Sequence, residues 1–167
     1  MAPYLLFFAL GLVALVQVSL LPALGISPVP PDPMLVIVVA WGVLRGARSA
    51  MIWALIAGLW LDLLSSGPFG AYTLGLLAAA GIAGFGSGTI YRSHWILALV
   101  MVAVATVAQD LIFVALLWLG QRPVSLPDTL TRLVLPEILY NMALMLLVFP
   151  LLSWVSRITG RERLPVE

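Results

Sequence analysis

Apolar residues run along this chain in long stretches, and short breaks rich in proline, glycine or polar residues separate them. The six apolar stretches cover residues 4–24, 34–44, 50–64, 71–89, 95–119 and 133–155. A helix needs about 20 apolar residues to cross a bilayer. Because residues 34–44 are too few, we expect them to form a short helical hairpin with residues 50–64 through a turn at 45–49. The pattern predicts an all-α integral membrane protein, a six-transmembrane-helix bundle with short second and third helices.

The composition of the chain supports this membrane assignment. Hydrophobic residues make up 63% of the 167 residues and charged residues 9%, whereas about a quarter of a typical globular domain is charged. At about 20 residues a span, this length holds roughly six helices and leaves no room for a separate soluble domain. We therefore expect a single membrane domain over residues 1–167.

The inventory of reactive side chains excludes several kinds of site. The chain has no cysteine and a single histidine, His94, so thiolate and histidine-rich metal sites are excluded. The eight arginines are spread among the predicted loops and form no basic patch for nucleic acid. We expect no cofactor, no metal ion, no nucleic-acid partner and no catalytic residue.

The positions of the arginines predict how the bundle is oriented. Positively charged residues of multi-span proteins concentrate in short cytoplasmic loops. Two arginines, Arg122 and Arg132, fall on one side of a six-span alternation, and the other six fall on the opposite side. These six are Arg45, Arg48, Arg92, Arg157, Arg161 and Arg163. This distribution predicts that both termini are cytoplasmic.

Residues 58–70 combine an apolar run with an acid and a break. Asp62 lies inside the run, and Ser65, Gly67 and Pro68 follow it. Acidic residues inside membrane spans are rare and are treated as candidates for functional sites. Glycine adopts positive φ readily and proline lacks a backbone donor. The break therefore predicts a tight or re-entrant turn at 65–70.

Polar side chains from four predicted helices fall at a similar depth, past the midplane toward the outer face, when a rise of about 1.5 Å per residue is applied. We expect them to form one polar site that includes the turn. The candidate residues are Gln17, Asp62, Ser65, Gly67, Pro68, Gln109, Asp110, Glu137 and Asn141.

The charge of this candidate site leaves three alternatives open. No arginine, lysine or histidine lies inside a predicted span to neutralise the acids. Either the carboxyl groups are protonated and bonded to neighbouring amides, or a cation comes from Arg122, Arg132 or another molecule. A third possibility is that the acids are helix ends that reach water, above all Glu137, which lies near the start of its helix.

Small residues recur along the predicted helix at 71–89. Ala80, Gly84 and Gly88 are spaced four residues apart. Small side chains at this spacing allow two helices to approach closely. We expect this face to pack against another helix of the bundle or against a partner.

Several of these motifs resemble the family of the rod shape-determining protein MreD. The resemblance rests on Pro31-Asp32 before the second span, on Arg45-Gly46 after it, and on Gly58-x-x-x-Asp62-Leu-Leu-Ser followed by Gly67-Pro68-Phe-Gly70. It extends over the whole chain, because the six spans, the length and the basic tail also agree.

The resemblance implies a function and a fold. It implies a non-enzymatic subunit of the bacterial cell-elongation machinery in the inner membrane, where it helps to regulate cell shape and peptidoglycan synthesis. The implied partners are an MreC-like single-span protein and, through it, MreB filaments and the elongation peptidoglycan synthase. The implied fold is similar to that of the substrate-capture subunits of energy-coupling-factor transporters.

Three classes of function fit the predicted bundle. The first is a scaffold that binds another membrane protein in an outer-half groove. The second is a substrate-capture subunit of a vitamin-type transporter, whose polar pocket takes a small solute. The third is a membrane enzyme that uses paired carboxylates for acid–base chemistry. We disfavour the third class, because no histidine, cysteine or lysine lies in a span and nothing resembles a phosphate clamp.

Overall fold

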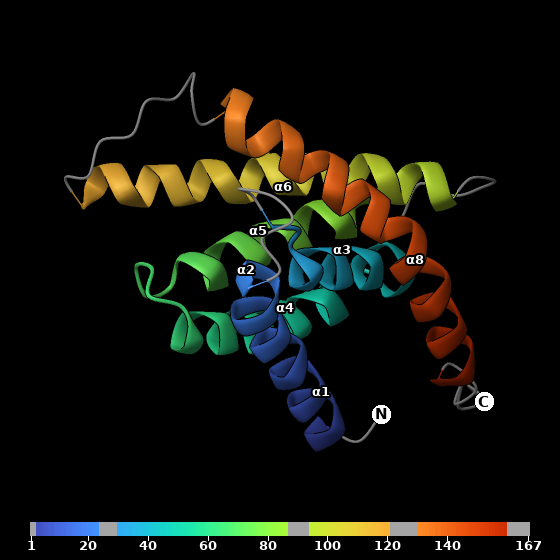
Figure 1. Ribbon diagram of the computed structural model, residues 1–167. Helices are drawn as coiled ribbons and strands as arrows, with labels where there is room; N and C mark the ends of the chain where they lie inside the picture. The colour runs from blue at the N-terminus through green and yellow to red at the C-terminus, as the bar shows by residue number, and fades with distance from the viewer. Residues whose placement is uncertain (1–2, 24–29, 87–93, 121–129, 160–167) are drawn as a thin grey trace.

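The structure is a computed structural model of the chain, and it describes residues 3–23, 30–86, 94–120 and 130–159 (Figure 1). Most of these residues are helical and none of them forms a strand, which confirms the predicted all-α class. In chain order the elements are α1 (Pro3–Leu15), the π-helix η1 (Val16–Leu20), α2 (Leu21–Ala23), α3 (Pro33–Arg45), α4 (Ala47–Leu64), α5 (Ala71–Gly86), α6 (His94–Leu119), the π-helix η2 (Leu130–Val134) and α8 (Leu135–Thr159).

The lengths of these helices support fewer membrane crossings than the six that the sequence predicts. In the part of the chain that the structure describes, three segments are long and apolar enough to cross a membrane: Ala47–Leu64, Trp95–Leu119 and Arg132–Ile158. Three further apolar segments are shorter: Tyr4–Leu20, Pro33–Arg45 and Ala71–Phe85. The apolar helices agree with a membrane protein, and the six crossings stay a prediction.

The short helix α3 lies at the centre of the bundle. It packs against α1, α4, α5, α6 and α8 (Figure 1). Most of its side chains, from Met34 to Val43, are buried. A helix that is apolar all round is typical of a buried position, because it needs no polar face. The outer helices instead expose leucines such as Leu12 and Leu147, as expected of surfaces that face lipid.

The turn between α3 and α4 is tighter than the predicted turn at 45–49. Gly46 alone separates the two helices, and its φ of 85° is a conformation that favours glycine. Behind this turn, Trp41 stacks on Trp53 with ring centroids 4.2 Å apart, and its Nε1 donates a 2.8 Å hydrogen bond to Ser49 Oγ. Arg45 donates to the carbonyl of Ser156 on α8 at 2.7 Å. These contacts fix this end of the hairpin against α8.

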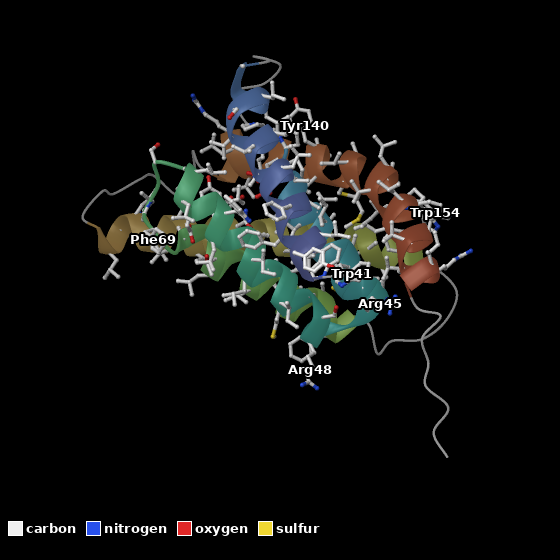
Figure 2. All side chains as sticks on the ribbon, turned by 90° about the horizontal axis from the view of Figure 1, so that it is seen from below. Trp41, Arg45, Arg48, Phe69, Tyr140 and Trp154 are labelled. Atoms are coloured by element: carbon white, nitrogen blue, oxygen red, sulfur yellow. The ribbon has the colours of Figure 1, made fainter. Side chains whose placement is uncertain are left out.

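The break after α4 is present as predicted. Residues 65–70 form a non-helical turn, in which Gly70 adopts a φ of 90°. The backbone N–H of Ala71 donates to the carbonyl of Pro68 at 3.1 Å, and α5 begins there. Figure 2 shows Phe69 of this turn near one end of the molecule, with Arg45 and Trp154 at the other. That the turn dips into a membrane stays a prediction.

Glycine and alanine bring α4 and α5 close together. A Cβ added at Gly84 would overlap Ala47 on α4, and a Cβ added at Gly58 would overlap the backbone of Thr73 on α5. Ala80 is fully buried. Gly84 therefore lies in a helix contact inside the bundle, whereas Gly88 lies outside the described residues.

Candidate functional site

Asp32 caps the central helix. Its side chain accepts a 2.9 Å hydrogen bond from the backbone N–H of Leu35, and Pro33 occupies the first helical position. This is the arrangement that an acidic N-cap and a proline at N1 produce. The Asp32 side chain is only 5% exposed. Its position at the end of a buried helix thus places a carboxyl group inside the protein.

Amide side chains from three other elements converge on Asp32. Gln17 of η1 donates from Nε2 to Asp32 Oδ1 at 3.0 Å, and Gln109 of α6 donates from Nε2 to Oδ2 at 2.6 Å. Asn141 of α8 accepts from the backbone N–H of Asp32 at 2.8 Å through its Oδ1. Gln17 Oε1 also accepts from the backbone N–H of Met34 at 3.1 Å. One residue therefore links η1, α3, α6 and α8.

The network continues from Asn141 into α6. The fully buried Asn141 donates from Nδ2 to Thr106 Oγ1 at 3.1 Å, and Thr106 donates to the carbonyl of Val102 at 2.8 Å. Burial raises the pKa of the Asp32 carboxyl, and its hydrogen bonds from Leu35, Gln109 and Gln17 oppose that effect. Buried polar networks specify one arrangement of the elements when their members are satisfied.

A cavity of about 600 Å³ lies beside this network. Its wall consists of η1, the residues before α3, the end of α4 with the turn after it, the start of α5, the second half of α6, η2 and the start of α8. Both π-helices of the described chain contribute to it, and π-helices are frequent at functional sites. The polar residues of the wall are Gln17, Asp32, Ser65, Ser66, Tyr72, Gln109, Asp110 and Glu137.

The polar side of the cavity is rich in hydrogen-bond acceptors. Three carboxyl groups line it, those of Asp32, Asp110 and Glu137, and no arginine, lysine or histidine is among the described residues of the wall. Gln109 Oε1, Asp110 Oδ2 and Ser65 Oγ are buried and have no hydrogen-bond partner within the described structure. Arg132 does not line the cavity, and Arg122 lies outside the described residues.

Asp62 has a different environment from the one that its depth suggested. Its carboxylate accepts from the backbone N–H groups of Tyr72 and Thr73 at 3.0 and 3.1 Å, and from Thr73 Oγ1. These are the second and third residues of α5, so Asp62 caps that helix from α4. Gly58, one turn earlier, leaves room for Thr73 to approach. Asp62 does not line the cavity.

The structure places the other candidate residues as follows. Gln17, Ser65, Gln109, Asp110 and Glu137 line the cavity. Asn141 lies behind the wall and holds Asp32 through its backbone. Gly67 and Pro68 are exposed on the turn and do not line the cavity.

The sequence analysis missed Asp32, Thr106 and Tyr72 as members of the site. Asp32 falls in the proline-rich break between the first two apolar stretches, and not inside a predicted helix. The order Pro31-Asp32-Pro33 was the available signal, since an acid followed by proline is typical of a helix N-terminus. Thr106 and Tyr72 carry no comparable signal.

The acids of the described chain are not arranged as a metal site. No three of the histidine, aspartate and glutamate side chains that the structure describes lie close enough together to hold a metal ion.

A comparison with protein families found a match over most of the chain. The family model of the rod shape-determining protein MreD matches residues 1–157. No curated protein and no solved structure matches the chain.

Proposed function

Because that match covers nearly the whole chain, the chain belongs to the MreD family of rod shape-determining membrane proteins, and we propose that it is a non-enzymatic subunit of the bacterial cell-elongation machinery. In this proposal it spans the inner membrane several times and binds an MreC-like single-span protein. That partner connects it to MreB filaments and to the elongation peptidoglycan synthase. Through these links it regulates cell shape.

The observation that carries this proposal is the acceptor-rich cavity. It lies toward the end of the bundle that holds the start of α3 and the 65–70 turn, opposite the Arg45 turn. If the arginine-rich end is cytoplasmic, as the charge distribution predicts, the cavity faces the periplasmic half of the membrane. A partner that crosses the membrane once and continues into the periplasm can reach it there.

Co-purification tests this function. We expect the tagged chain to carry a single-span partner through purification in mild detergent. The double variant Asp110→Asn/Glu137→Gln should lose most of it, because it removes two carboxyl groups from the cavity wall. The control is Arg48→Gln, which changes a charge on α4 at the opposite end of that helix from the cavity. Equal partner recovery by the double variant would contradict a partner site in the cavity.

The cavity volume favours one alternative function, substrate capture for a vitamin-type transporter. About 600 Å³ lies within the range of about 300–1,000 Å³ that is typical of small-molecule sites. Native mass spectrometry of the purified chain separates the two functions. A stoichiometric small molecule without a protein partner supports transport, and a protein partner without such a molecule supports the scaffold.

A further inference from the structure

The cavity wall contains buried hydrogen-bond acceptors that no donor of the described structure reaches. One N–H group of each of the Gln17 and Gln109 side-chain amides donates to Asp32. Gln109 is only 7% exposed, and its Oε1 accepts no hydrogen bond within the described structure. Asp110 Oδ2 is likewise buried without a partner. A buried acceptor without a donor is costly, so the cavity is complementary to a ligand that donates several hydrogen bonds.

Charge and shape narrow the class of ligand further. Three carboxyl groups share the cavity without a cation among the described wall residues, and they repel one another when they are ionised. A positively charged ligand removes this repulsion. Among the described residues, no three acids are grouped as a metal-ion site. An organic cation meets both requirements of the wall, because it carries positive charge and hydrogen-bond donors.

The remaining wall is apolar and partly aromatic. Tyr72 and Phe113 lie with ring centroids 6.0 Å apart and planes inclined by 56°, and Leu64 and Leu117 line the same cavity. An ammonium group is compact and strongly hydrated, whereas a guanidinium group is planar, weakly hydrated, carries five donors and stacks on aromatic faces. The guanidinium matches both halves of this wall, the acceptors and the rings.

We propose that the cavity binds the guanidinium group of an arginine side chain that the partner protein inserts between α5, α6 and α8. This inference rests on the partner-binding function proposed above and names the chemical group that the partner supplies. Asp110 and Glu137 neutralise the charge, and Gln109 Oε1 accepts one of the N–H groups.

Three small probes test the inference on the purified full chain in nanodiscs. They are the N-acetyl, N′-methylamide derivatives of arginine, lysine and citrulline, and citrulline has nearly the shape of arginine without its charge. Affinities come from the rise in thermal unfolding midpoint with probe concentration. We expect the arginine probe to bind about tenfold more tightly than the lysine probe and about a hundredfold more tightly than the citrulline probe.

Variants locate the binding. Asp110→Asn and Glu137→Gln should each weaken binding of the arginine probe about tenfold. Arg48→Gln should leave it unchanged, because Arg48 lies at the end of α4 away from the cavity. Lack of binding by the arginine probe at about 10 mM, equal affinity for citrulline or lysine, or unchanged affinity in both cavity variants would overturn the inference.

The outcome is separable from that of the proposed function. Tight, charge-dependent arginine binding by a chain that never retains a protein partner contradicts partner binding alone. Conversely, if the chain retains a protein partner but does not bind the arginine probe, only the guanidinium assignment is contradicted.

Discussion

Two buried aspartates, Asp32 and Asp62, each stabilise the start of a helix, and their surroundings give them different roles. Asp32 caps its own helix, and its carboxylate also accepts hydrogen bonds from the side-chain amides of Gln17 and Gln109. Asp62 caps a neighbouring helix, and the hydrogen bonds that it accepts from described residues come from α5. The first therefore joins several elements beside a cavity, and the second joins one pair of helices. Gly58 and Asp62 act together on Thr73. The missing side chain of Gly58 leaves room for Thr73, and the Asp62 carboxylate accepts a hydrogen bond from its backbone N–H.

Asp62→Asn tests the capping role. Asparagine keeps one acceptor oxygen but cannot accept from Tyr72 and Thr73 with two carboxylate oxygens. We expect the free energy of unfolding to fall by about 0.5–2 kcal/mol, the range for loss of a helix cap. Unfolding of the purified chain in detergent, followed by circular dichroism, measures this change. Wild-type stability in both Asp62→Asn and Asp62→Ala would contradict the role.

At the scale of helices, close approach of α4 and α5 holds the polar groups in place. The small residues that allow it are Gly58 and Ala47 on α4 and Gly84 on α5, where Ala83 precedes it. Gly42 of α3 also lies against Ala83, so three helices meet with little side-chain volume between them. This packing brings the N-terminus of α5 within reach of Asp62.

Paired glycine substitutions test this contact. In Gly84→Ala the new methyl group overlaps Ala47, and Gly84→Leu is larger still. We expect each to lower the free energy of unfolding, by about 1–3 kcal/mol for the leucine. The matched control is Gly81→Ala on the same helix, whose Cβ would meet only Met51 Cε at 4.0 Å. It should be neutral or slightly stabilising, because alanine favours helix over glycine. Equal stability of the Gly84 and Gly81 alanine variants would contradict the contact.

At the scale of the whole molecule, the two ends of the bundle differ in charge and in shape. One end carries Arg45 and Arg48 at the tight Gly46 turn, with Arg157 near the end of α8. The other end carries the 65–70 turn and the cavity with its three carboxyl groups. This polarity agrees with an arginine-rich cytoplasmic side and an acidic site in the outer half of the membrane.

Reporter fusions test the orientation. A reporter fused after Glu167 should read the cytoplasm, and one inserted within residues 121–131 should read the periplasm, because positive charge is retained in cytoplasmic loops. Alkaline phosphatase and green fluorescent protein make a complementary pair of reporters for each position. If both positions report the same compartment, the six-span arrangement is wrong.

The local sequence determined most of the helices, because the length and apolarity of a run, with glycine and proline at its ends, decide where a membrane helix begins and stops. It therefore predicted the apolar runs that form α3 to α6 and the break after Leu64. It also predicted that Asp62 is an acid inside an apolar helix. It also predicted a polar site, from residues of equal depth.

Only the tertiary structure decided which of those polar residues meet. Depth along a helix says nothing about the direction in which a side chain points around the helix, and that direction depends on how the helices pack. Packing turned Asp62 toward α5 and away from the cavity. It also buried Asp32, which lies in a proline-rich break of the sequence, because α6 and α8 close over the start of α3 and supply Gln109 and Asn141 to it.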